Sequence, residues 1–165
     1  MWKKYDDPRP YCTVGGFAID ENGRFPIMHR SNNVRSVRDC WSLPTGNHEL
    51  GSVMKDQFNT ELSEELGLEP FGDTVNIGWY DNVSKETENW WHWVVHIVVV
   101  RVSSLDTITN KEPHKHDEIR CVSLNELYGM ISCGVKFAPG HAEFFVAHRE
   151  QISAAFRALN HQTVR

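Results

Sequence analysis

The sequence predicts an α/β domain in which helices cover both faces of a mixed β-sheet. Segments with the alternating or valine-rich composition of β-strands recur along the chain, one amphipathic helix interrupts them, and another helix ends the chain. Hydrophobic residues make up 40% of the 165 positions and charged residues 24%, which favours a packed core over global disorder. We therefore expect a single domain over residues 1–165.

The first predicted elements are strands. The segment YCTVGGFAID (11–20), the turn ENGR and the segment FPIMHR (25–30) together predict a β-hairpin. A polar loop then leads to the short strand CWSLP, which Pro44 ends.

The central helix is expected from Ser52 to Leu66. Its buried edge is predicted by four apolar residues at four-residue spacing: Met54, Phe58, Leu62 and Leu66. Ser52 is a candidate N-cap, and Gly67 is a candidate terminator because glycine readily adopts the left-handed conformation that ends helices.

The remaining elements follow in a simple order. They are strands at 73–82 and 90–104 joined by the hairpin loop SKETEN, a strand at 119–124, a short helix from Asn125 to Met130, and a last helix from about Gly140 to Leu159.

Charge and composition exclude several classes of protein. Seventeen basic and 22 acidic residues give a net charge of -5, which argues against bulk nucleic-acid binding. The charged N-terminus is no signal peptide, and the apolar run WVVHIVVV is too short to span a membrane. The four cysteines are far apart without a C-x-x-C pair, so we expect reduced cysteines and a cytoplasmic protein.

Three carboxylates gather on the predicted central helix. Glu61, Glu64 and Glu65 fall within an arc of roughly 100° next to the buried edge, so their side chains converge. Such a cluster is either a solvated helix face or a site for a hard divalent cation, which takes oxygen ligands and leaves room for phosphate oxygens.

The loop and helix from Gly46 to Leu68 resemble the signature of the Nudix family, G-x5-E-x7-R-E-U-x-E-E-x-G-U, where U is aliphatic. The matching residues are Gly46, Glu61, Leu62, Glu64, Glu65, Gly67 and Leu68. The stretch WSLPTGNHELG is similar to the family's entry W-x-L-P-G-G-x-x-E-x-G. The resemblance implies a Nudix-type α/β/α sandwich with a mixed β-sheet and a loop-helix-loop catalytic motif.

Two positions depart from the signature. Ser52 stands where the family has its first Glu, and Thr60 stands where it has Arg. In the family this Arg positions the Glu that follows it, which is Glu61 here. Because Thr cannot form a bidentate ion pair with a carboxylate, the departure puts the orientation of Glu61 in doubt.

The resemblance also implies a reaction. Nudix enzymes cleave a diphosphate linked to a nucleoside with the help of Mg²⁺ or Mn²⁺. It implies Glu64 and Glu65 as metal ligands, the Gly46 carbonyl as a further metal contact, and Glu61 as a third ligand or the general base.

A second loop and one arginine complete the predicted site. The segment NKEPHKHDE (110–118) is similar to the E-P-x-K-x-E-x-W segment of Nudix enzymes that act on nucleoside triphosphates. Glu112, Asp117 and Glu118 are its candidate metal ligands, with Asp117 preferred. Arg30, at the end of a strand, is the candidate phosphate contact because Arg binds phosphate in a bidentate manner.

Histidines and tryptophans leave alternatives open. His114 and His116, two positions apart in the loop, could share a face, but no third zinc ligand is evident. The tryptophans of NWWHW (89–93) either stack a base or pack in a core or dimer interface.

Two classes of function follow. The first is a pyrophosphohydrolase for a small-molecule nucleotide, converting a nucleoside triphosphate to monophosphate and pyrophosphate. Nucleotide sugars, ADP-ribose, dinucleoside polyphosphates and capped RNA are further substrates of this class. The second is an attenuated domain that binds or senses nucleotides. A homodimer is plausible from family habit.

Overall fold

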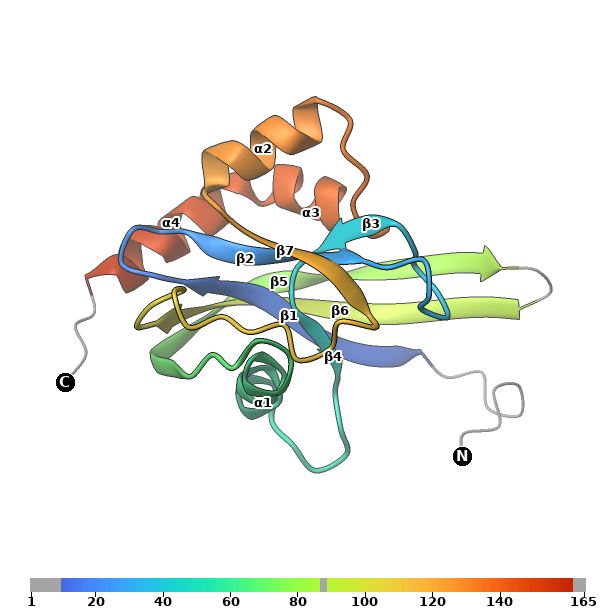
Figure 1. Ribbon diagram of the computed structural model, residues 1–165, viewed down its shortest axis with the longest axis horizontal. Helices are drawn as coiled ribbons and strands as arrows, with labels where there is room; N and C mark the ends of the chain where they lie inside the picture. Colours follow the sequence, from blue (N-terminus) through green and yellow to red (C-terminus); the bar gives the residue numbers. More distant parts are fainter. Residues whose placement is uncertain (1–9, 87–88, 162–165) are drawn as a thin grey trace.

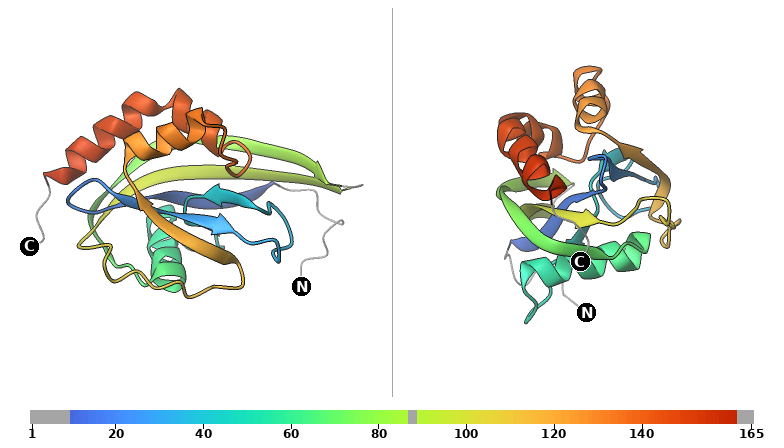
Figure 2. Two further views of the ribbon diagram at one scale, coloured as in Figure 1. Left: turned by 45° about the horizontal axis from the view of Figure 1, so that its top comes forward. Right: turned by 90° about the vertical axis from the view of Figure 1, so that its left-hand side faces the viewer.

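The computed structural model describes residues 10–86 and 89–161. Strands form the middle of the molecule, with α1 (Met54–Leu66) against one side. The other side is covered by α2 (Leu124–Ser132), α3 (His141–Ala147) and α4 (Arg149–Asn160), as Figures 1 and 2 show. This arrangement confirms the predicted fold class. No helix within the described ranges is long and apolar enough to cross a membrane.

The described strands form two sheets. One is mixed and has the order β4 (Thr45–Asn47), β1 (Tyr11–Ile19), β6 (Asn89–Val102), β5 (Pro70–Glu86). Within it β1 and β6 are parallel, and the other pairs are antiparallel. The second sheet is antiparallel and has the order β3 (Cys40–Ser42), β2 (Phe25–Arg30), β7 (His116–Val122).

Strand β6 separates two hydrophobic cores because its side chains alternate between faces. Val95, Ile97 and Val99 belong to the core beneath α3 and α4, together with Phe145 and Phe156. The other face of β6 contributes to the core beneath α1, which contains Val98, Val100, Val102, Phe58, Leu62 and Leu66. The buried edge predicted for the central helix is therefore correct, and it seats α1 on the mixed sheet.

The predicted hairpin of the first two strands is wrong. The turn does close through the Asp20 N–H and the Arg24 carbonyl, at 3.0 Å. Beyond it, β1 pairs with β4 and β6, whereas β2 pairs with β3 and β7. The strands diverge because Phe17 and Phe25, 4.9 Å apart in an edge-to-face contact, fill the core between the two sheets.

Two helix boundaries also differ from the prediction. The N-cap of α1 is Val53, which forms no side-chain capping hydrogen bond, while the Ser52 hydroxyl makes other contacts. The last helix is divided at His148, whose backbone leaves helical geometry with φ −110° and ψ 23°. The predicted terminator is confirmed, since Gly67 ends α1 at φ 68°.

The tip of the predicted SKETEN loop lies outside the described residues, between Glu86 and Asn89.

Candidate functional site

Helix α1 carries the signature carboxylates to different environments. Glu65 is buried, with 7% of its surface exposed, and Glu61 is half-buried. Both line a cleft of about 740 Å³, whereas Glu64 is exposed and is not among the described residues that line it. The structure therefore brings Glu61 and Glu65 together inside the cleft and places Glu64 at the solvent side of the helix.

Gly46 is required by the position of Glu61. A Cβ atom on Gly46 would lie 1.8 Å from the carboxyl carbon of Glu61. The backbone of β4 thus forms the surface against which the Glu61 side chain packs, and any larger residue would displace that carboxylate. This contact explains why a glycine is needed at position 46, which lies 15 positions before Glu61 in the sequence.

Gln57 holds Glu61 in the absence of the signature arginine. Its Nε2 donates a hydrogen bond of 2.9 Å to Glu61 Oε1. Its Oε1 accepts from the Glu49 N–H at 3.3 Å and lies 2.9 Å from the Ser52 hydroxyl. A backbone N–H can only donate, so this contact orients the buried amide with its NH₂ group toward Glu61.

Thr60 makes no such contribution. Its hydroxyl donates to the Asp56 carbonyl at 2.9 Å on the exposed side of the helix. Glu61 is therefore held by Gln57, one helical turn before it, and not by the residue directly before it at position 60.

Burial shapes the protonation of both cleft carboxyls. Burial, and after it the negative charges of Glu61 and Glu112, raise the pKa of Glu65 to about 8. The pKa of Glu61 is also raised by burial, while the hydrogen bond from Gln57 opposes that rise. Ionising these two neighbouring carboxyls costs free energy, and a bound cation would lower that cost.

The loop before β7 is attached to the end of α1. The Lys111 N–H donates to the Glu65 carbonyl, and the Thr109 N–H to the Leu66 carbonyl, both at 3.0 Å. These bonds satisfy carbonyls that the end of the helix leaves free. They also bring the next residue, Glu112, next to the Glu65 side chain.

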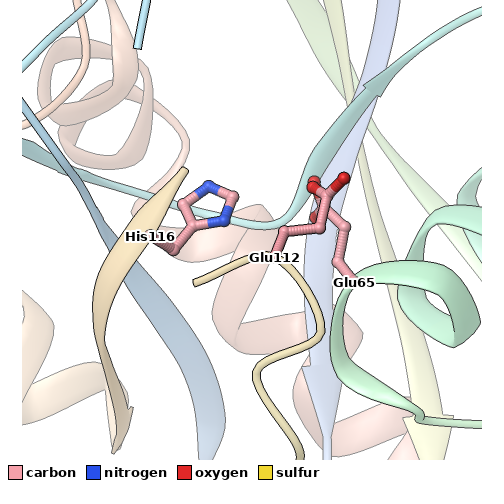
Figure 3. Close-up of side chains that lie close together, drawn as sticks. All are labelled: Glu65, Glu112 and His116. Atoms are coloured by element: carbon pink, nitrogen blue, oxygen red, sulfur yellow. The ribbon is translucent and has the colours of Figure 1, made fainter. Parts of the chain in front are cut away.

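Glu65, Glu112 and His116 form a candidate metal centre, shown in Figure 3. One ligand atom from each lies within 4.8 Å of the others. The Oε2 atoms of Glu65 and Glu112 are buried without a hydrogen-bond partner in the described chain. Since buried polar atoms are normally paired, these oxygens and the imidazole fit a divalent cation.

His116 is suited to bind a metal as a neutral imidazole. It is 2% exposed, and burial with the nearby Arg30 charge lowers its pKa to about 4. Its backbone N–H bonds to the Glu112 carbonyl at 3.0 Å, which closes a turn that presents both side chains to one place. Sequence reasoning considered His116 only as half of a zinc pair; the E-x3-H spacing of a loop turn was the available signal.

Asp117, the preferred ligand from the sequence, lies elsewhere. Its carboxylate is exposed and bonds to His29 Nδ1 at 2.6 Å. Glu118 is also exposed and pairs with Arg120. Of the three candidates in this loop, Glu112 is the one the fold brings to the signature glutamates.

Three basic residues line the cleft, namely Arg30, Arg35 and Lys115. Arg30 lines it and donates to the carbonyls of Val37 and Ser36, at 2.8 and 3.1 Å, which holds the preceding loop in place. Lys115 also lines the cleft and pairs with Glu112 Oε1 at 2.6 Å. The cleft thus combines acidic ligands for a cation with basic groups for an anion.

A family model for the NUDIX domain matches residues 11–145. The chain belongs to this family. The family predicted from the signature is therefore confirmed, and membership supports a hydrolase of phosphoanhydride bonds. No curated protein matches the chain significantly.

Solved structures show the same fold. The MutT NUDIX hydrolase from Burkholderia pseudomallei is 19% identical, with a TM-score of 0.62 over 88% of this chain and 97% of that chain. The MutT protein from Methanosarcina mazei Go1 is 21% identical, with a TM-score of 0.59 over 95% and 100%. The NUDIX domain of Shewanella oneidensis NrtR, complexed with ADP ribose, is 15% identical, with a TM-score of 0.65 over 90% and 94%.

Replacing Gln57 should change the acidity of Glu61. In metal-free Gln57→Leu, we expect the pKa of Glu61 to rise above its wild-type value, because its carboxylate loses a buried hydrogen-bond donor. Carbon-13 NMR titration of the glutamate carboxyls measures this shift. Thr60→Ala is the matched control and should leave the value unchanged; an equal shift in both variants would refute the role of Gln57.

Removing the Glu65 charge should change how stability depends on pH. The pKa of Glu65 is about 8 in the folded state and roughly 4.3 in the unfolded state. At pH values between these two, Glu65 holds a proton in the folded state that it has lost in the unfolded state. Without metal, stability should therefore fall by a few kcal/mol from pH 5 to pH 8. Urea denaturation in EDTA should show a smaller fall for Glu65→Gln, while exposed Glu64→Gln should behave like the wild type.

Proposed function

We propose that this protein is a Mg²⁺- or Mn²⁺-dependent Nudix pyrophosphohydrolase that cleaves the diphosphate linkage of a nucleoside diphosphate derivative. The leading substrate is a nucleoside triphosphate, converted to the monophosphate and pyrophosphate. The observation that carries the proposal is the unpartnered, buried pair of carboxylate oxygens on Glu65 and Glu112, beside His116 and in the same cleft as Glu61.

The residues of the cleft suit the reaction. When bound, the divalent cation polarises phosphoryl oxygens and lowers the pKa of a water ligand. Glu65, Glu112 and His116 would hold it, with the Gly46 carbonyl as a further contact that the family resemblance implies. Glu64, which the resemblance also implies as a ligand, is exposed and lies outside the cleft. Glu61, oriented by Gln57, would then accept the proton of the attacking water.

Phosphate binding is assigned to Arg30 and Lys115. Both line the cleft, and Lys115 already pairs with Glu112 of the acidic cluster. Arg30 is already oriented by two loop carbonyls, so binding an anion would cost it little additional side-chain entropy.

The choice of a triphosphate is supported by the loop 110–118. It resembles the E-P-x-K segment of triphosphate-cleaving Nudix enzymes, and its Glu112 and Lys115 both enter the cleft. ADP-ribose is the second candidate, because the similar domain of Shewanella oneidensis NrtR was solved with it.

An enzyme is favoured over a binding or sensor module by the contacts of Glu61. Two departures from the signature, Ser52 and Thr60, favour a loss of catalysis. Gln57 now supplies a donor to the same carboxylate, and Gly46 leaves the space that this carboxylate occupies. A module that only binds nucleotides would have no physical need for these costly buried acids.

A hydrolysis assay tests the function. Purified protein is incubated with Mg²⁺ or Mn²⁺ and a panel of nucleoside triphosphates, nucleotide sugars, ADP-ribose and dinucleoside polyphosphates. We expect metal-dependent turnover that Glu65→Gln reduces by about 100-fold or more, since a charged metal ligand is lost. Exposed Glu69→Gln is the control and should retain activity. Folded, metal-binding protein without turnover of any member would instead establish a binding module.

His116 should shift the metal preference from Mg²⁺ toward Mn²⁺, because Mg²⁺ takes oxygen ligands and an imidazole suits transition metals better. We expect His116→Gln to weaken Mn²⁺ binding by about tenfold, in the range seen for altered metal sites, and Mg²⁺ binding less. Electron paramagnetic resonance of free Mn²⁺ measures the affinity, and ¹⁴N coupling to bound Mn²⁺ should disappear. Exposed His114→Gln, in the same loop, should leave both unchanged.

A further inference from the structure

The aromatic residues that line the cleft with the acidic cluster include Tyr11 on β1 and Trp91 and Trp93 on the neighbouring strand β6. The rings of Trp91 and Trp93 stack at 5.3 Å with an angle of 7° between their planes. Tyr11 lies 6.3 Å from each, at tilts of 35° and 33°. We call these three residues the aromatic shelf. All three side chains are partly exposed, so the shelf offers ring surface to a ligand in the cleft.

A buried histidine supplies a polar atom in the same cleft. His141 lines it and is 5% exposed. Its Nδ1 is hydrogen-bonded to the Tyr80 hydroxyl at 2.7 Å, while its Nε2 is buried without a partner among the described residues. Burial lowers its pKa to about 4, so the ring is neutral at neutral pH. A fixed neutral imidazole with one open nitrogen recognises a hydrogen-bonding edge rather than a charge.

The distance from the shelf to the acidic cluster suits a nucleotide. In the β1 register Tyr11 pairs with Trp93, and Val14 pairs with Gly46, on which Glu61 packs. Three residues of strand correspond to about 10 Å. A ribose and a phosphate bridge a separation of this size, so a base on the shelf would leave the diphosphate at the carboxylates.

Packing does not account for the whole arrangement. The large aromatic core of the domain lies beneath α3 and α4, where Phe17, Phe25 and Phe145 are fully buried. Trp93 touches that core, but the shelf as a whole remains partly exposed in the cleft. An unpaired nitrogen on an otherwise buried His141 costs free energy in the unliganded protein, which a ligand atom would recover.

We infer that the aromatic shelf and His141 form a binding site for the planar nitrogenous base of the substrate. The base stacks on the shelf, and its polar edge bonds to His141 Nε2. The inference rests on the proposed function in one respect, namely that a diphosphate lies at the acidic cluster. It restricts the substrate to compounds that present a free base to the cleft, and it makes His141 a determinant of which base binds best.

Binding experiments without turnover test this site. The probes are the 5′-monophosphates of adenosine, guanosine, cytidine and uridine, measured by calorimetry without metal, and inorganic tripolyphosphate measured with Mn²⁺. Trp93→Ala should weaken binding of the monophosphates by about tenfold, because base-aromatic stacking is lost, and should leave tripolyphosphate unchanged. Trp79→Ala is the matched control, since Trp79 is 57% exposed on β5 and does not line the cleft.

His141→Asn tests the polar contact and should change the order of preference among the four bases. Because His141 is buried, the melting temperature of His141→Asn is measured together with its binding. If His141→Asn does not fold, Trp93→Ala still tests the site. Equal losses for tripolyphosphate and monophosphates, or no effect of Trp93→Ala, would overturn the inference. Dissociation of a dimer by Trp93→Ala with unchanged nucleotide binding would also overturn it, and would make the shelf an interface. These outcomes do not depend on hydrolysis, so they are distinct from failure of the proposed function.

Discussion

The burial of acidic side chains where α1, β4 and the loop before β7 meet is the constraint on which the site depends. An ionised carboxylate loses hydration when it is buried, and a second one nearby adds repulsion. Glu65 shows the result in its raised pKa of about 8. The hydrophobic face of α1 and the hydrogen bonds from Thr109 and Lys111 to the end of that helix hold the acids together against this cost. The fold thus maintains an unfavourable electrostatic arrangement that a bound cation would relieve.

The support of Glu61 shows how one requirement can be met by different residues. The reaction needs a carboxylate at a defined position with a donor beside it. In the signature an arginine provides the donor, and here a neutral amide does so from one helical turn earlier. An amide stabilises a carboxylate less than a guanidinium does, but its orientation is determined by the Glu49 N–H. Ser52, the other departure from the signature, touches the same amide and so belongs to the network that supports Glu61, whereas Thr60 lies outside it.

The cleft also joins two kinds of recognition. Charged groups from α1 and the 110–118 loop line one part of it and, in the proposed function, would act on the phosphates that all nucleotides share. The aromatic residues of β1 and β6, with His141 from α3, line another part and, in the inferred base site, would contact the base, which differs between nucleotides. Parallel pairing of β1 with β6 places Tyr11 beside Trp93, so the mixed sheet itself assembles the aromatic part of the cleft.

The sequence by itself determined the family, the fold class, the helix that carries the acids, its buried edge and its terminator. These features depend on local spacing, such as four-residue periodicity and the position of Gly67, and local spacing can be read along the chain. Only the tertiary structure decided that Glu112 and His116 join Glu65, that Asp117 pairs with His29 instead, and that β1 and β2 enter different sheets. These outcomes depend on which segments pack together across more than 40 residues of chain, and on the side of a turn or strand to which a side chain points. A shift of one residue reverses that direction, so spacing alone could not distinguish among the acids of one loop.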